Sequence, residues 1–256
     1  MRAGEVELAG TLEGDFADPF ILRAGGTYHA FATGAGHRHL QVARSSDLVT
    51  WSELGDALPS LPAWAAKGDG FTWAPAVLAR GRSFVLYYTT RHAASGFQCI
   101  SAATATTPAG PYVDDSRDPL LCQTGRPSGE LCGSIDPSPF VDVDGTAHLL
   151  WKSDENSAAC RGTPRLWSQR LTDDGRGLVG EPTVLLARTS PWEGDIIEAP
   201  TMTIHQGRYY LFYSANWYAS RAYAIGYATC AGPGGPCQKV TVSEPLFRSA
   251  GRMWGP

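Results

Sequence analysis

Three carboxylic acids, far apart in the chain, are the residues best suited to chemistry. Asp18 and Asp136 each stand directly before a proline, and Glu198 stands two residues before Pro200. One protonated and one ionised carboxyl could act as the general acid and the general base of a hydrolysis. A single Asp-Pro pair is usually structural, because the carboxylate can bond its own backbone and proline fixes φ. The three acids therefore form a site only if the fold brings them together.

An internal repeat gives a reason to expect this convergence. Four segments share a proline preceded by Asp or Ala, a short apolar run, a turn containing Gly, and an apolar run rich in aromatic residues. The prolines, at positions 19, 75, 137 and 200, are 56, 62 and 63 residues apart. Regular spacing of this size indicates that the chain is built from repeated structural units.

Each repeat predicts a hairpin followed by further strand-like sequence, about four strands in all. The chain has 29 Gly and 18 Pro among 256 residues, which favours many short strands joined by tight turns. Four strands per repeat are typical of a β-propeller blade. We therefore predict an all-β fold, a single β-propeller domain over residues 1–256 with four blades. A β-sandwich is the alternative, but it does not explain the regular spacing.

Equivalent positions of successive blades surround one axis, so the four repeat starts should meet at one mouth of the central channel. Asp18, Asp136 and Glu198 would then face one pocket, with Trp73 at the equivalent place in the second repeat. The loops after the second strand of each repeat should return to this mouth, roughly at 34–39, 91–97, 152–161 and 215–221. Their polar and aromatic residues are His37, His39, His92, Lys152, Asp154, Glu155, Asn156, Asn216, Trp217 and Arg221.

From these loops we select His92, Asn216 and Arg221, together with Trp73, as candidate substrate-binding residues. Polar side chains could read the hydroxyl groups of a polar ligand, and an aromatic ring could stack on it. For any one of the loop histidines, a solvated surface position is the more ordinary interpretation.

Charge and hydropathy argue against two classes of partner. The net charge of −4 predicts no basic face for nucleic acid, and no apolar run approaches the roughly 18 residues of a membrane span. We therefore expect neither nucleic acid nor a membrane as a partner. The first ten residues lack the apolar core of a signal peptide, but six cysteines suit an oxidising compartment. We expect an extracellular protein.

The six cysteines show no C-x-x-C spacing, so we predict no cysteine metal site. Cys230 and Cys237 flank the turn-rich segment AGPGGP, and Cys122 and Cys132 flank a loop of Gly, Pro and Ser. We predict these two disulfides, which leaves Cys99–Cys160 as the third. Buried free thiols are the alternative.

The chain resembles glycoside hydrolase family 43 and the clan of five-bladed propeller glycosidases that it shares with family 62. The resemblance rests on ADPF at 17–20, TWAP at 72–75, SIDPSPFVDVDG at 134–145, IIEAP at 196–200 and GRYYLFYSAN at 207–216. Each motif is short, but together they follow the expected order over nearly the whole chain.

The resemblance implies an inverting hydrolase of α-L-arabinofuranosyl or β-xylosyl linkages in arabinan, arabinoxylan or derived oligosaccharides. It implies that Asp18 is the general base, Glu198 the general acid, and Asp136 the third acid that tunes the pKa of the general acid. Trp73 would lie near the sugar. No cofactor is needed for the chemistry, although many members hold calcium or another ion in the central channel, with a histidine of the fifth blade nearby.

The number of repeats departs from the family pattern. The family has five blades, whereas four repeats are visible and the chain ends at Pro256, where a fifth would begin. We therefore expect a domain truncated at the start of the fifth blade, with exposed apolar blade faces that favour instability or association.

Three alternatives to an arabinofuranosidase or arabinanase stay open. The first is a β-xylosidase. The second is a carbohydrate-binding propeller that no longer catalyses. The third is a related propeller enzyme that acts on fructans with retention, whose key carboxyls would lie about 5–5.5 Å apart rather than about 6.5–9.5 Å.

Overall fold

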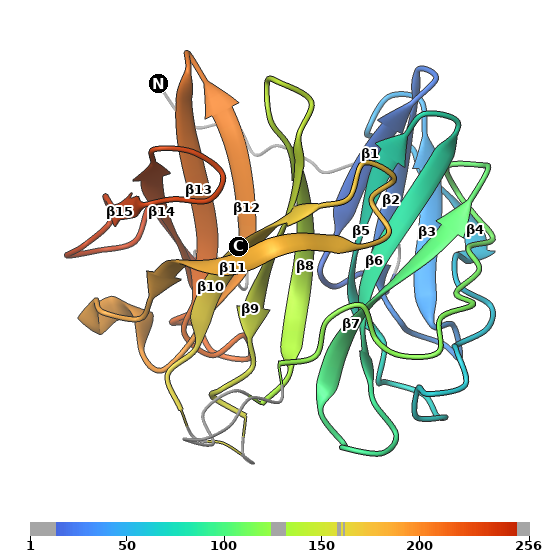
Figure 1. The fold of residues 1–256 in the computed structure, drawn as a ribbon, viewed down its shortest axis with the longest axis horizontal. Coiled ribbons are helices and arrows are strands. Elements are labelled where there is room, and N and C mark those ends of the chain that lie inside the picture. The colour runs from blue at the N-terminus through green and yellow to red at the C-terminus, as the bar shows by residue number, and fades with distance from the viewer. Residues whose placement is uncertain (1–13, 124–131, 158–159, 161, 250–256) are drawn as a thin grey trace, which may run out of the picture.

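The computed structural model describes residues 14–123, 132–157, 160 and 162–249. Four antiparallel sheets lie one after another around a common axis, as the blades of a propeller (Figure 1). Within the described residues the one helical element is a 3-10 turn, Pro191–Glu193. The predicted all-β propeller is therefore confirmed. In the part of the chain that the structure describes, no helix has the length and apolarity to cross a membrane.

The four blades follow the chain order. Blade 1 contains β1 (Phe20–Ala24), β2 (Thr27–Thr33), β3 (Leu40–Ser45) and β4 (Ser52–Asp56). Blade 2 contains β5 (Trp73–Arg80), β6 (Ser83–Arg91) and β7 (Gln98–Ala105). Blade 3 contains β8 (Ser134–Val141), β9 (Ala147–Ser153), β10 (Arg165–Leu171) and β11 (Leu178–Ala187). Blade 4 contains β12 (Ile197–His205), β13 (Arg208–Ala215), β14 (Ala224–Cys230) and β15 (Cys237–Lys239), and β16 (Phe247–Arg248) also pairs with β14.

Blade 2 differs from the predicted four strands, because its sheet has three. The segment after β7 makes only isolated bridges to it, from Val113 to Thr104 and from Leu121 to Ile100. Pro119 lies between these two bridges, and a proline lacks the N–H that a regular ladder requires. The segment therefore runs antiparallel beside β7 without forming a continuous fourth strand.

Tight hairpins join the first two strands of the blades, as the glycine in each repeat predicted. Ala24 pairs with Thr27 across Gly25 and Gly26, which have φ of 57° and 82°. In blade 4, the two-residue turn contains Gly207, with a φ of 73°. Turns with positive φ match the right-handed twist of paired strands, so the register of each hairpin is fixed at its tip.

The core lies between neighbouring blades. Phe31 and Leu40 of blade 1 belong to one buried cluster with residues of blade 2, which include Leu86. Trp151 of blade 3 lies in the cluster shared with blade 2, and a third cluster joins blades 3 and 4. Replacing a buried ring such as Trp151 by Ala would cost about 3–5 kcal/mol of stability. This packing fixes each inner strand relative to the axis.

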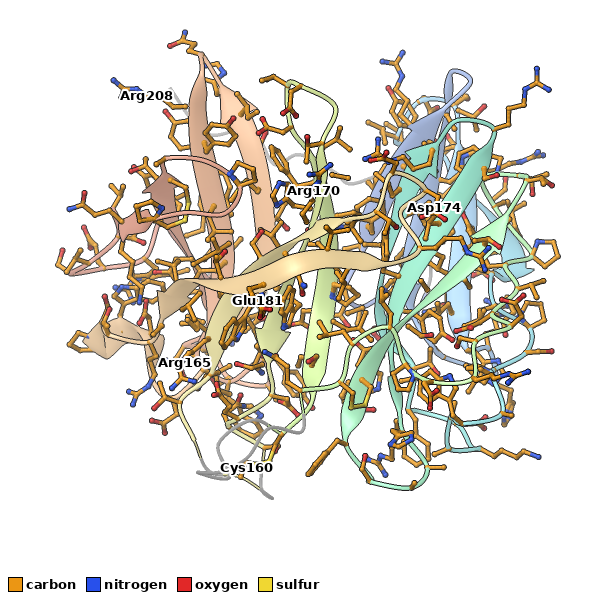
Figure 2. The ribbon with its side chains drawn as sticks, viewed as in Figure 1. Cys160, Arg165, Arg170, Asp174, Glu181 and Arg208 are labelled. Carbon is orange, nitrogen blue, oxygen red and sulfur yellow. A yellow bond between two sulfur atoms is a disulfide. The ribbon has the colours of Figure 1, made fainter. Side chains whose placement is uncertain are left out.

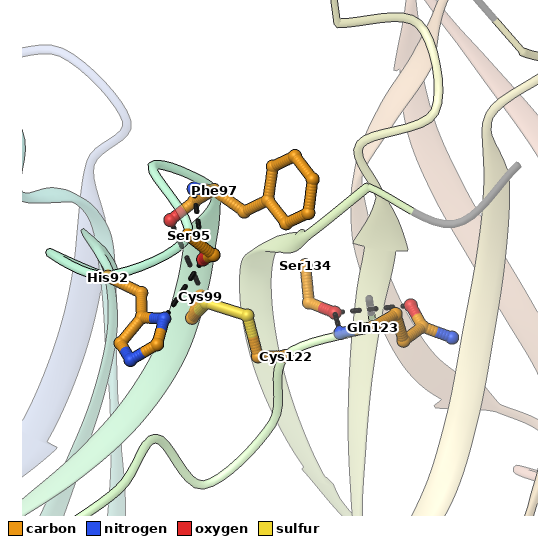
Figure 3. The surroundings of a disulfide bond; sticks show 7 residues. All are labelled: His92, Ser95, Phe97, Cys99, Cys122, Gln123 and Ser134. Carbon is orange, nitrogen blue, oxygen red and sulfur yellow. Dashed lines mark hydrogen bonds between the residues drawn. A yellow bond between two sulfur atoms is a disulfide. The ribbon is translucent and has the colours of Figure 1, made fainter. Parts of the chain in front are cut away.

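The structure corrects two of the three predicted disulfides. Cys230–Cys237 is present as predicted, but the other pairs are Cys99–Cys122 and Cys132–Cys160. Leu121 pairs with Ile100 of β7, which places Cys122 opposite Cys99 (Figure 3). The prediction for Cys122 assumed that the ends of its own loop meet, and it missed this pairing between distant segments.

Two of the disulfides lie toward one end of the molecule. Cys99 is the second residue of β7, and Cys132 lies two residues before β8. Cys160 lies near Arg165, the first residue of β10, whereas Arg170 and Arg208 lie toward the opposite end (Figure 2). The end that carries these two disulfides is also the end at which β5, β8 and β12 begin.

Candidate active site

The starts of the four inner strands line one cavity of about 290 Å³. Its wall includes the four residues that precede the repeat prolines, namely Asp18, Ala74, Asp136 and Ala199. Segments separated by 56 to 63 residues in the chain therefore meet on one axis. The predicted convergence of the repeat starts is observed, although Glu198 and Trp73 are not among the residues that line this cavity.

These four residues share an unusual backbone conformation. Their φ angles are 52° for Asp18, 46° for Ala74, 57° for Asp136 and 50° for Ala199. Residues other than glycine rarely adopt this region, and such strain is often found where a functional site requires a particular geometry. In β5, β8 and β12 the pairing register also shifts at this point. Such β-bulges change the direction of side chains, here at the mouth of the channel.

Side chains of one blade bind the first amide groups of the next. The backbone N–H of Ala74 donates to Thr33 Oγ1 at 3.0 Å, and that of Asp136 donates to Thr89 Oγ1 at 3.2 Å. Thr33 and Thr89 occupy the same place in their repeats, fourteen residues after the proline. The N–H of Ala199 donates instead to Asp136 Oδ2 at 2.9 Å. Asp136 therefore connects blades 3 and 4 as well as facing the cavity.

Asp18 has an open side and a hydrogen-bonded side. It is exposed at the cavity, while the hydroxyl of Thr33 donates to Oδ2. Partial burial raises the pKa of Asp18, and the negative charge of Glu198 adds to that rise, whereas the Thr33 hydrogen bond opposes it. An accessible carboxylate held by one donor could accept a proton from water.

Glu198, the second residue of β12, has a partner for each carboxylate oxygen. Lys152 Nζ lies 3.1 Å from Oε2, and the Tyr223 hydroxyl donates to Oε1 at 2.9 Å. Lys152 is only 2% exposed and also lies 3.5 Å from Asp154 Oδ1. Burial lowers the pKa of Lys152, but Glu198, Asp154 and Asp136 together raise it above its ordinary value. The buried ammonium group therefore stays charged among the acids.

Asp136 has the most perturbed carboxyl of the three. Burial first, and the charge of Glu198 second, raise its pKa to about 7, although Lys152 opposes the rise. Two adjacent acids in a site with little water do not both ionise readily. Near neutral pH, this part of the site can therefore hold a proton that an isolated aspartate would have released.

The four predicted substrate-binding residues lie in different surroundings, and three of them are on blades 2 and 4 as follows. Trp73 begins β5 beside Ala74, with its indole N–H donating to Gly70 O at 2.8 Å. Asn216 fixes a turn, since its side chain donates to Trp192 O and accepts from the Trp217 amide. Arg221 is exposed in the same loop of blade 4.

His92 lies on blade 2 and interacts with its own loop. Its Nδ1 atom is 2.9 Å from Ser95 Oγ (Figure 3). Its ring centroid is 5.9 Å from that of Trp64. Neither Ser95 nor Trp64 is one of the three candidate catalytic acids. A role for His92 in binding substrate stays a prediction.

Sequence reasoning assigned no catalytic part to Lys152 or Tyr223. Lys152 gave a signal, because it ends an apolar run at the point where the strand was expected to return to the mouth. Tyr223 gave none, since it follows the loop expected at 215–221 and only the fold shows that it reaches Glu198. The outer end of the loop expected at 152–161, Arg161, lies outside the described residues, as do residues 254–256, where the fifth repeat was expected to begin.

A calcium ion in the channel requires a cluster of oxygen ligands. Within the described residues, no three of His, Cys, Asp and Glu are grouped so as to hold a metal ion. Apart from Asp18 and Asp136, the cavity wall consists of uncharged residues such as Ser138 and Thr201. The calcium ion therefore stays a prediction, and no chemical step below passes through one.

Comparisons with known proteins identify the family. The family model described as glycosyl hydrolases family 43 matches residues 10–256. A crystal structure of a thermostable family-43 glycoside hydrolase is 30% identical with a TM-score of 0.80, covering 95% of this chain and 77% of that one. An endo-1,4-beta-xylanase from Bacteroides thetaiotaomicron is also 30% identical, with a TM-score of 0.74 and coverage of 92% and 75%.

An endo-arabinase from the same organism has the same fold, with a TM-score of 0.74 at 24% identity over 92% of this chain and 82% of that one. The named neighbours thus differ in substrate while sharing the propeller. The family match covers all three acids and every residue that lines the cavity. The chain is a member of glycoside hydrolase family 43.

Proposed function

We propose that this glycoside hydrolase cleaves α-L-arabinofuranosyl linkages of arabinan, arabinoxylan or their oligosaccharides with inversion; the alternative is a β-xylosidase. The observation that carries the proposal is the meeting of Asp18, Asp136 and Glu198 at one mouth, with the pKa of Asp136 raised to about 7. Three interacting acids of different environment suit a reaction that needs one acid and one base. We also propose that residues 1–256 form a single propeller domain.

In this mechanism Asp18 accepts a proton from a water molecule, whose oxygen then bonds to the anomeric carbon. At the same time the bond from that carbon to the leaving oxygen breaks, and Glu198 gives its proton to the departing oxygen. The reaction leaves Asp18 protonated and Glu198 ionised, and exchange of protons with solvent restores both. The open side of Asp18 at the cavity supports its part as the base.

Asp136, Lys152 and Tyr223 act on Glu198 rather than on the sugar. Asp136 and Glu198 interact electrostatically, and this interaction favours one shared proton on the pair. Lys152 and Tyr223 each contact one oxygen of Glu198, so the carboxyl cannot rotate freely. A general acid held in one orientation loses less entropy on reaching the transition state.

The three disulfides support a place of action outside a reducing cytoplasm, because such bonds persist mainly in oxidising compartments. Plant cell-wall polysaccharides would be met there. We therefore propose an extracellular enzyme.

The test compares 4-nitrophenyl α-L-arabinofuranoside with the matching β-D-xyloside. The wild-type protein should hydrolyse one of them, and Glu198→Gln should lower kcat/KM on a substrate with a poor leaving group by about 10³-fold. Glu181→Gln, an exposed glutamate on β11, is the control and should keep the wild-type rate. Equal rates for wild type and Glu198→Gln on the substrate with the poor leaving group would contradict the proposal.

Proton NMR of the first product formed decides the stereochemistry. Inversion supports the water-activating role of Asp18, whereas retention would favour a nucleophile of the fructan-enzyme type. Binding of arabinan or arabinoxylan without hydrolysis of any glycoside would favour the non-catalytic propeller.

A further inference from the structure

Trp217 and Tyr218 are unusually exposed for their residue types. They are 57% and 72% exposed, and their rings contact each other edge to face at 6.2 Å between centroids. Every other tryptophan and tyrosine in the described part of the chain is at least partly buried. Indole and phenol rings dominate binding energies when a ligand covers them, so two adjacent exposed rings indicate a contact surface.

The loop that carries the two rings is ordered by its own hydrogen bonds. Asn216 at its start donates from the backbone to Ile196 O at 3.0 Å. The amide of Ser220 donates to Trp217 O at 2.9 Å, and that of Tyr223 donates to Ser220 O at 3.2 Å. The rings are therefore presented by a turn that needs little further ordering when a ligand binds, which favours affinity.

The same loop reaches the acid site. Tyr223, five residues after Tyr218, donates its hydroxyl to Glu198 Oε1 at 2.9 Å. Asn216 directly follows Ala215, which pairs with Ile197 beside Glu198. The exposed rings thus belong to the segment of blade 4 that contacts the general acid, whereas Asp18 comes from blade 1.

From these contacts we propose that Trp217 and Tyr218 bind the sugars on the leaving-group side of the bond that is cut. The inference deepens the proposed function and rests on it, because the general acid stands beside the leaving oxygen. A polymer or oligosaccharide continues from that oxygen, and aromatic faces stack on the apolar faces of its sugars. A nitrophenyl glycoside has no sugars there, so the rings make the enzyme prefer a saccharide leaving group.

The first test compares two kinds of substrate with the same glycosyl group. In the double variant Trp217→Ala/Tyr218→Ala, kcat/KM on arabinan or arabinoxylan oligosaccharides should fall about tenfold or more, while the nitrophenyl glycoside changes less than about twofold. Trp217→Phe should keep most of the oligosaccharide activity. The control is Trp51→Ala, since Trp51 is a partly exposed ring between β3 and β4, at the far end of blade 1. Equal losses on both substrates, or no loss on the oligosaccharides, would overturn the inference.

A second test separates the inference from the proposed catalysis. Affinity electrophoresis of Glu198→Gln through gels containing arabinan, arabinoxylan or xylan measures binding without turnover. Retardation in at least one gel should disappear when Trp217→Ala and Tyr218→Ala are added, and should persist when Trp51→Ala is added. If the wild type hydrolyses nothing but this pattern holds, the proposed function fails and the binding surface stands. No retardation in any gel, or retardation unaffected by loss of the two rings, would sink the inference.

Discussion

Asp18 and Asp136 are the same dipeptide at the same place in two blades, yet their surroundings differ. Both precede a proline, and their φ angles are 52° and 57°. Asp18 lines the cavity and accepts a hydrogen bond from the Thr33 hydroxyl of its own blade. Asp136 instead accepts a hydrogen bond from the backbone N–H of Ala199 in the next blade. The repeat therefore fixes position and backbone, and the neighbouring blade decides what the carboxyl can do.

The charged neighbours make the same distinction. Asp136 lies near Glu198 and Lys152, and its pKa rises to about 7, largely through burial. Asp18 is affected by Glu198 as well, but the Thr33 hydroxyl counteracts the effect. The comparison teaches that one repeat can yield a carboxyl suited to remain ionised and a carboxyl suited to share a proton.

The largest expected effect comes from Asp18→Asn. If Asp18 is the base, kcat should fall by about 10³-fold at every pH, because an amide cannot accept the proton of the attacking water. Circular dichroism and the melting temperature should stay near the wild-type values, since the side chain is exposed at the cavity. A loss no greater than that of Asp136→Asn would break the comparison between the two aspartates.

Asp136→Asn should have a smaller effect on kcat, about 10²-fold, and a distinctive effect on stability. The native carboxyl holds its proton up to about pH 7, whereas the unfolded chain releases it near pH 4. This group therefore makes the free energy of unfolding fall as the pH rises from about 4 to about 7. An asparagine keeps an oxygen for the Ala199 amide but does not titrate. Urea unfolding at several pH values should therefore show a flatter profile between about pH 4 and 7.

The matched control for that experiment is Asp173→Asn, because Asp173 is a fully exposed aspartate of blade 3. Its pH profile should follow the wild type. A profile of Asp136→Asn that is as steep as the wild type would show that Asp136 does not hold a proton in the native state.

Lys152→Met tests whether the positive charge of Lys152 contributes to the difference in pKa between Asp18 and Asp136. Without its positive charge the pKa of Asp136 should rise further, so the basic limb of the kcat/KM profile should move up by about one pH unit. The maximal rate should fall about tenfold, because Glu198 loses the donor on Oε2. Lys152→Arg keeps the charge and should leave the limb in place. A lower rate with an unshifted limb in Lys152→Met would reduce Lys152 to a packing role.

The smallest effect compares Thr33→Val with Thr89→Val. Both hydroxyls accept a hydrogen bond from a backbone amide of the next blade, but only the Thr33 hydroxyl also donates one to Asp18. Each variant should lose about 1 kcal/mol of stability. Thr33→Val should in addition lower kcat severalfold, while Thr89→Val should not. Equal kinetic losses would mean that the Thr33 hydroxyl has no special effect on Asp18.

The sequence alone was enough to predict the blades and the convergence of the acids, because the repeat sets both the strand order and the equivalent positions. It could not predict how Tyr223 reaches Glu198, since this contact depends on the path of a loop across blade 4. It also missed the pairing of Cys99 with Cys122 and the three-strand sheet of blade 2. These features depend on which distant segment lies beside β7, and a local pattern carries no information about that.

The placement of two disulfides near the channel mouth has a consequence for preparing the enzyme. Both Cys99–Cys122 and Cys132–Cys160 tie segments near the starts of β7 and β8, while the apolar clusters between blades contain neither bond. Material made in a reducing host would be expected to pass solubility and spectroscopic checks while its rim is loosened. Specific activity per mole of formed disulfide, rather than yield of soluble protein, is then the quantity by which batches should be compared.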